Sequence, residues 1–241
     1  MTEQSKTHLA IDQAVRLLFA DPDWQFKMGI GCLINGGAFA LLLLNVVLLP
    51  LCFCLWSLVA GYILMTTASK VANPDNNLPA WTNFLELLIG GGIWIGASAL
   101  HFALFVGLAF LSLLVGELTG LDNLMSPLFL VWATISWTII VLAAATISLI
   151  SSYLLVNFAT QQNLVAAFQV RQVVLRLLSQ PRQMLEAWLI QLGLIYVATI
   201  IPTLTVLGIF LIPSTVFFAQ LIGCCLLSQA WRAAPLEAKK N

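Results

Sequence analysis

Charge is scarce in this chain of 241 residues. Only 8% of its residues are Asp, Glu, Lys or Arg, whereas ordinary soluble domains carry about 25%. The ten basic residues are balanced by ten acidic ones, so the sequence offers neither a basic field nor an acidic tail. This balance excludes nucleic acid as a partner.

Residue types that carry enzyme chemistry are equally few. The five cysteines, an odd number, all fall inside uncharged runs and show neither a disulfide framework nor zinc spacing. No phosphate loop, nucleophile elbow or metal-binding helix motif is present in the sequence. We therefore expect a protein that is not an enzyme and that needs no cofactor.

Hydrophobic residues, in contrast, make up 61% of the chain, and its mean hydropathy is +0.98. One soluble core could not bury so much apolar surface, so lipid must be the solvent for most of the chain. No charged residue occurs between Lys27 and Lys70, and this run as one helix would be about 63 Å long, twice the roughly 30 Å of a hydrocarbon core. It must fold back, and Pro50 is the predicted turn.

The same analysis of uncharged runs and prolines predicts six membrane spans. They lie within a single membrane domain over 8–232, between a mobile tail at 1–7 and a second tail at 233–241. The predicted spans are about 28–49, 51–69, 90–115, 127–152, 186–204 and 208–230. The expected fold class is an all-α polytopic membrane protein whose six transmembrane helices form three hairpins.

The positions of the basic residues predict the orientation. With six spans, all ten Lys and Arg fall on one side of the membrane, and the opposite side carries only Glu117 and Asp122. The positive-inside rule then places both termini in the cytoplasm. A seven-span scheme that divides Asn123–Val170 would put three arginines outside, so we reject it. We expect a multi-pass protein of a bacterial inner membrane or of a thylakoid membrane.

Two or three cytoplasmic segments have the pattern of amphipathic helices that lie on the bilayer surface. Residues 8–20 place apolar side chains on one side and Asp12 and Arg16 on the other. Residues 81–89 form a short amphipathic segment before the third span. The first segment is more simply an interfacial helix than a docking helix for a partner.

The third such segment, 161–180, carries a narrow polar stripe. The stripe repeats at intervals of three and four residues, and its members are Gln169, Gln172, Arg176 and Ser179. We predict that Gln169, Gln172 and Arg176 face a partner.

Small and aromatic residues suggest further roles within the spans. A face of small residues in the third span predicts close helix packing and consists of Gly92, Gly96, Ala99, Ala103 and Gly107. Tryptophans near the ends of predicted spans are expected to anchor at headgroup depth, namely Trp24, Trp81, Trp188 and Trp231. Asn35 and Asn45 in the first span should each find a hydrogen-bond partner on a neighbouring helix.

His101 lies near the middle of the third span, where an ionisable residue calls for a functional hypothesis. The simpler interpretation is a neutral imidazole bonded to a backbone carbonyl or to an asparagine. The alternative is an axial ligand for haem or a chlorophyll-type pigment, since one neutral imidazole nitrogen is enough to bind such a metal.

Several short motifs support a family resemblance. They are Asp23-Trp24 with Lys27 and Gly31, Gly61-Tyr62, Leu78-Pro79-Ala80-Trp81 with Phe84 and Gly91, and Asn157 followed by Ala167-Phe168. With these motifs the chain, from about residue 15 to 230, resembles the bacterial and archaeal integral membrane proteins grouped as domain of unknown function 4013. The resemblance implies a multi-pass membrane protein and no known reaction.

Three functional classes remain open. A non-catalytic scaffold, assembly factor or accessory subunit is favoured, because soluble domains are absent and small-residue faces are plentiful; its partners would be the lipid bilayer and other membrane proteins. A transporter or lipid-handling protein would use broken helices, to which Pro202 and Pro213 point. A haem- or pigment-binding protein would depend on His101 alone.

Overall fold

The computed structural model describes residues 11–119, 128–205 and 207–234, and every regular element in them is a helix. The predicted tails and the expected connection around Asp122 therefore lie largely outside the described residues. The α-helices are α1 (Ile11–Phe19), α2 (Trp24–Leu44), α3 (Leu49–Ala72), α4 (Phe84–Thr119), α5 (Phe129–Gln161), α6 (Val170–Ser179), α7 (Pro181–Thr203) and α8 (Ile212–Ala233). Three short 3-10 segments join them, namely η1 (Val46–Leu48), η2 (Leu164–Phe168) and η3 (Leu207–Leu211).

Six of the described helices are long and apolar enough to cross a membrane. They are α2, η1 with α3, α4, α5, α7, and η3 with α8. The all-helical, multi-pass character predicted from composition is therefore confirmed.

The first turn between spans differs from the prediction. The chain turns at Asn45, which has an extended backbone and accepts a 2.9 Å hydrogen bond from Val47 N through its side chain. Pro50 lies instead in the first turn of α3. A proline fits there because its missing N–H would have no partner inside the helix. Asn45 thus caps a turn, and Asn35 donates to Pro213 O at 2.7 Å as expected.

The structure also differs from the prediction at two of the segments expected to be interfacial helices. Residues 81–83 are not helical, and 84–89 are the first turns of α4, which continues without a break for 36 residues. No separate helix therefore exists at 81–89, because no helix-breaking proline interrupts the chain after Phe84. The segment 161–180 is divided into η2 and α6 around Gln169.

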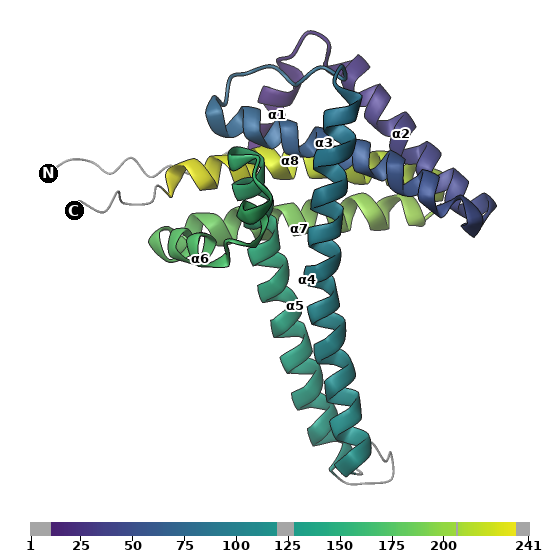
Figure 1. Cartoon of the computed structure of the whole chain (residues 1–241), viewed down its shortest axis with the longest axis vertical. Helices are drawn as coiled ribbons and strands as arrows, with labels where there is room; N and C mark the ends of the chain where they lie inside the picture. The colour runs from purple at the N-terminus through teal and green to yellow at the C-terminus, as the bar shows by residue number, and fades with distance from the viewer. Residues whose placement is uncertain (1–10, 120–127, 206, 235–241) are drawn as a thin grey trace, which may run out of the picture. The chain divides into compact units, whose positions relative to one another are not determined.

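The described chain divides into two compact units, and the single membrane domain expected over 8–232 stays a prediction. The first contains the described residues up to Ile95 and from Ser152 onward, and the second those of Gly96–Ser151. In the second unit, the outer parts of α4 and α5 lie side by side (Figure 1), and a Cβ on Gly116 would overlap the ring of Trp132. The boundary between the units falls inside α4 and inside α5, so each of these two long helices contributes residues to both units.

Helix α8 is the centre of the first unit. It packs against α7, α3, α2 and α1 (Figure 1), and half of the residues in its most apolar stretch are buried. Its fully buried side chains include Phe217, Leu221, Leu226 and Leu227. Consecutive helices α2 and α3 also pack against one another, as do α7 and α8.

Helices α3 and α4 meet at two glycines. A Cβ on Gly91 would overlap Ser57 O and Gly61 N, and a Cβ on Gly61 would overlap the carbonyl of Leu87. The two backbones are therefore in direct contact, as small residues permit in helices that lack a hydrophobic driving force for association.

This contact predicts that Gly91→Ala destabilises the fold by about 1–3 kcal/mol, the usual effect of overpacking. The matched control is Gly90→Ala, because a Cβ on Gly90 meets nothing within 4 Å and alanine raises helix propensity. The measurement is the apparent unfolding temperature in mild detergent, read from tryptophan fluorescence. An unfolding temperature for Gly91→Ala equal to that of Gly90→Ala would contradict the contact.

Candidate functional site

A buried carboxylate joins three segments of the first unit. Asp21, in the turn between α1 and α2, has a side chain with no exposed surface. Its Oδ2 accepts hydrogen bonds of 2.7 Å from Lys27 Nζ and from Leu78 N, and its Oδ1 accepts one of 2.8 Å from Asp23 N. Three donors therefore compensate the buried charge, and the group is fully engaged in holding the fold.

The same bonds continue to two aromatic side chains. Lys27 Nζ also donates to Leu78 O at 2.7 Å, and Trp81 Nε1 donates to Lys27 O at 2.9 Å. The Trp81 ring stacks on Tyr62 with centroids 4.1 Å apart and planes at 2°, and Tyr62 OH donates to Pro79 O at 3.2 Å. We call Asp21, Lys27, Tyr62, Leu78 and Trp81 the Asp21 network. It fastens the connection between α3 and α4 to both α2 and α3.

Opposing effects act on the pKa of Asp21. Burial alone would raise that pKa, because desolvation disfavours the carboxylate. The hydrogen bond from Lys27, the backbone N–H groups of Asp23 and Leu78, and the positive charge of Lys27 together lower it below its ordinary value. Asp21 is therefore ionised near neutral pH, and its charge stabilises the native state.

A second cluster holds α6 against the end of α8 within the first unit. The Arg176 guanidinium donates from Nη1 to Ala234 O at 3.1 Å and to Trp231 O at 3.3 Å, and it lies 4.1 Å from the centroid of the Trp231 ring. The ring of Tyr153 stacks on the same Trp231 ring, with centroids 6.2 Å apart, and the Tyr153 hydroxyl donates to Met184 O at 2.7 Å. Burial lowers the pKa of Arg176, although an arginine stays charged at any physiological pH.

The polar residues of 161–180 make hydrogen bonds within the chain, and the expectation that Gln169, Gln172 and Arg176 face a partner stays a prediction. Gln169 Oε1 accepts from Asn157 Nδ2 at 3.2 Å, and Gln172 Oε1 accepts from Gln161 Nε2 at 3.3 Å. Arg176 contacts Trp231 as described. The exposed residues of α6 include Leu175 and Leu178 together with Arg171 and Ser179.

The tryptophans predicted as interfacial anchors are mostly covered by protein. Trp81, Trp188 and Trp231 are buried, with at most 7% of each residue exposed. Trp24 is half-buried and packs edge-on against Phe19, with ring centroids 4.5 Å apart. Trp81 is bonded to Lys27 and stacked on Tyr62, and Trp231 contacts Arg176 and Tyr153, whereas the anchoring role of the four rings stays a prediction.

The small-residue face of α4 is not the face that packs in the second unit. Gly96, Ala99, Ala103 and Gly107 are exposed, whereas the residues toward α5 include His101 and Gly116. At 100° per residue, the two sets lie on opposite sides of the helix. Gly92, in the first unit, is half-buried, and a Cβ there would lie 3.6 Å from Ser57 Oγ.

His101 is half-buried and reaches α5. Its Nδ1 lies 3.3 Å from Ser151 Oγ, within hydrogen-bond reach of this hydroxyl on α5. Within residues 11–119, 128–205 and 207–234, no group of three or more His, Cys, Asp and Glu side chains could hold a metal ion.

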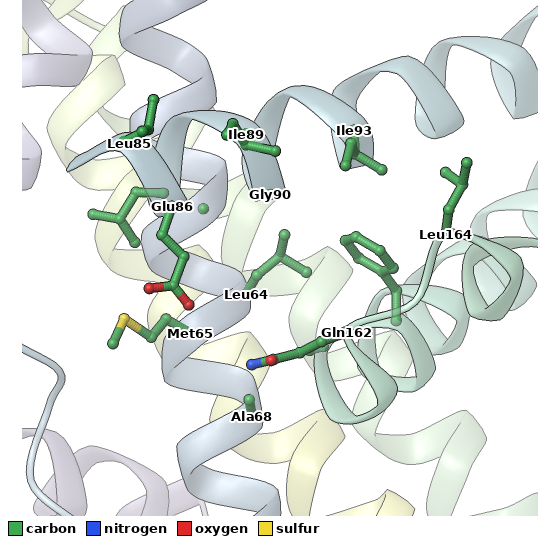
Figure 2. Close-up of a pocket in the computed structure, with 14 residues that line it drawn as sticks. Leu64, Met65, Ala68, Leu85, Glu86, Ile89, Gly90, Ile93, Gln162 and Leu164 are labelled. Carbon is green, nitrogen blue, oxygen red and sulfur yellow. The ribbon is translucent and has the colours of Figure 1, made fainter. Parts of the chain in front are cut away.

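A groove lies between α3, the start of α4 and the end of α5, and its volume is about 470 Å³. Its walls are mainly apolar and include Leu64, Ile89, Ile93 and Phe158. The carboxylate of Glu86 and the amide of Gln162 both point toward the stretch of α3 that carries Met65 and Ala68, as Figure 2 shows. No sequence motif indicated this groove, because its lining comes from three helices that are distant in sequence.

Comparison with known proteins adds a family and no reaction. The family model described as "Protein of unknown function (DUF4013)" matches residues 42–207. The match includes Tyr62 and Trp81 but begins after Asp21 and Lys27. No curated protein matches the chain, and no solved structure does.

The Asp21 network predicts that Asp21→Asn lowers the free energy of unfolding by about 3 kcal/mol at pH 7, as expected when one partner of a buried ion pair is removed. Asp23→Asn is the matched control, because Asp23 is exposed and makes no capping bond. Denaturant unfolding in detergent measures both.

The pH dependence has a definite sign. Because the pKa of Asp21 is lower in the folded chain, its contribution is present above about pH 3.9, the ordinary value, and is lost as the pH falls through the folded pKa. The stability difference between wild type and Asp21→Asn should therefore shrink below pH 4. A difference that is independent of pH would show that the charge has no role.

Proposed function

The chain belongs to the DUF4013 family of proteins of unknown function, and we propose that it is a non-catalytic scaffold, assembly factor or accessory subunit of a membrane-protein complex. Its partners are the lipid bilayer and other integral membrane proteins. The observation that carries this proposal is the exposed small-residue stripe of α4, formed by Gly96, Ala99, Ala103 and Gly107.

The stripe lies between large apolar side chains. Leu100, Phe102 and Leu104 are each more than half exposed beside it. Gly and Ala between such ridges form a shallow depression where a second helix can approach closely. In lipid, that close approach gives van der Waals contact that acyl chains do not supply, so a partner helix is favoured at this face.

The proposed topology is three hairpins with both termini in the cytoplasm of a bacterial cell or on the corresponding face of a thylakoid membrane. All ten basic residues then lie on the cytoplasmic side, which supports this orientation. The connection between α4 and α5 lies on the opposite side.

Helices α1 and α6 are proposed to lie in the headgroup layer of the cytoplasmic side. Leu175 and Leu178 of α6 are exposed while its polar stripe is bonded within the chain. In α1, Leu18 is buried, whereas Ile11 and Phe19 are about 40% exposed. Helices with an exposed apolar side and a polar side are suited to the membrane surface.

The topology predicts the accessibility of single cysteines to a membrane-impermeant thiol reagent. The five native cysteines are first replaced. In that background, Arg171→Cys should react only in permeabilised cells, where the reagent reaches the cytoplasmic side, whereas Glu117→Cys should react in intact cells. Both positions are exposed in the chain. Reaction of both from the same side would contradict the three-hairpin topology.

The scaffold role predicts that Ala103→Leu with Gly107→Leu reduces the recovery of co-purifying membrane subunits at least ten-fold, because the larger side chains fill the depression. Thr138→Leu, at an exposed position of α5, should leave recovery unchanged. Affinity purification in mild detergent with quantitative mass spectrometry measures this.

The same affinity purification distinguishes the scaffold role from the other two functional classes. Visible absorbance that His101→Ala abolishes would favour a pigment- or haem-binding protein, and a bound solute without any stoichiometric subunit would favour a transporter. Either result would replace the scaffold proposal.

A further inference from the structure

We propose that the α3–α4–α5 groove binds one phospholipid with a primary-amine headgroup. This goes beyond the scaffold role, because it concerns a different surface and requires no partner protein. It depends only on α3, α4 and α5 being membrane spans. Four observations support it, namely the depth of the groove, its polarity, an acidic group without a cation, and the types of hydrogen-bonding atoms at its mouth.

The ends of three candidate spans meet at the groove. Helix α3 ends at Ala72, α4 begins at Phe84 and α5 ends at Gln161. The lining residues Ala68, Glu86 and Gln162 lie within four residues of those ends. The ends of transmembrane helices lie near the membrane surface, so this part of the groove is at headgroup depth.

The polarity of the groove changes along its length. Glu86 is two residues from the start of α4, whereas Ile93 lies about 10 Å farther along the helix at 1.5 Å per residue. Phe158 and Leu64 line the groove together with Ile93. A polar end beside the membrane surface and an apolar end deeper in the bilayer match the two parts of a phospholipid. The volume of about 470 Å³ is enough to hold one chain segment and part of a headgroup.

Glu86 has no cationic partner within the described chain. The ion pairs there are Lys27 with Asp21 and Arg182 with Glu186. Glu86 Oε2 accepts a hydrogen bond from Asn83 Nδ2 at 3.2 Å, and the N-terminus of α4 favours its negative charge, but neither of these supplies a cation. An ammonium group from a ligand would supply the missing positive charge.

The amide of Gln162 points to the same region (Figure 2). The backbone of Gln162 has a φ angle of 50°, in the left-handed region that glycine and asparagine adopt more readily than glutamine. Its side-chain amide offers an N–H donor for a phosphate oxygen and a carbonyl acceptor for an ammonium N–H.

These acceptors favour a primary amine over a quaternary one. A primary ammonium donates three hydrogen bonds, and the Glu86 carboxylate and the Gln162 carbonyl can accept them. A choline headgroup has no N–H to donate and is bound by cages of aromatic rings, whereas Phe158 is the one aromatic residue among the lining residues. We therefore assign the groove to phosphatidylethanolamine.

The test uses the full chain, purified in detergent, stripped of lipid and titrated in native mass spectrometry. The probes are dioleoyl phosphatidylethanolamine, dioleoyl phosphatidylcholine and dioleoyl phosphatidylglycerol, which share their acyl chains. We expect one ethanolamine lipid to bind at least ten-fold more tightly than the other two. Glu86→Gln should remove that preference, and Glu117→Gln, at an exposed carboxylate near the other end of α4, should retain it.

A second variant tests whether the site is the groove itself. Ile93→Trp should abolish the tight binding by filling the apolar end, and the unfolding temperature of each variant should stay within a few degrees of wild type. Equal affinity for the three lipids, tighter binding of the glycerol lipid, or full retention of the preference in Glu86→Gln would overturn the assignment. Because no partner is present in this experiment, its outcome is independent of the scaffold proposal.

Discussion

The need to satisfy every polar group from within the chain shapes this protein. Lipid supplies no hydrogen bonds, so a charge or an amide near the bilayer must find its partner among the protein's own atoms. Asp21 meets this constraint with three donors, and Lys70, which is 2% exposed, meets it by donating to Asn76 O at 2.6 Å and to Pro74 O at 3.1 Å. Both groups bring a connecting segment onto the ends of helices.

The same constraint explains the orientation of α6. A soluble protein would turn Gln169 and Gln172 toward water and bury the leucines. Here the glutamines bond with Asn157 and Gln161, and Leu178 is 70% exposed. Arg176 is held over Trp231 for the same reason. Leucine side chains therefore remain on the exposed surface of α6 beside Arg171, a pattern that suits a helix at the membrane surface.

Apart from these bonded groups, the two exposed features of α4 described above are mainly apolar and differ in shape. The stripe of Gly96, Ala99, Ala103 and Gly107 is a depression suited to another helix. The groove beside Glu86 is deeper and ends in an acidic group, which suits an amphipathic small molecule. Shape and the carboxylate of Glu86 therefore distinguish a proposed protein-binding surface from a proposed lipid site on the same helix.

The sequence by itself determined the solvent of the chain, the number of apolar helices and the family. These follow from composition, from the spacing of charges and from short motifs such as Leu78-Pro79-Ala80-Trp81. It also placed most helix ends within a few residues, although Pro50 marks the start of α3 and not the turn before it. A proline excludes a helix interior but permits a first turn, so the residue alone does not say which applies.

Only the tertiary structure decided which side of each helix meets protein. Gly91, not the predicted Gly92, makes the tight contact with α3, and a shift of one residue rotates the contact by about 100°. Trp81 is buried against Tyr62 although its position suggested the bilayer surface. The physical reason is that lipid and the protein interior are similarly apolar. Hydrophobic periodicity therefore distinguishes a polar helix face from an apolar one. It does not distinguish an apolar face that packs on another helix from an apolar face that meets lipid.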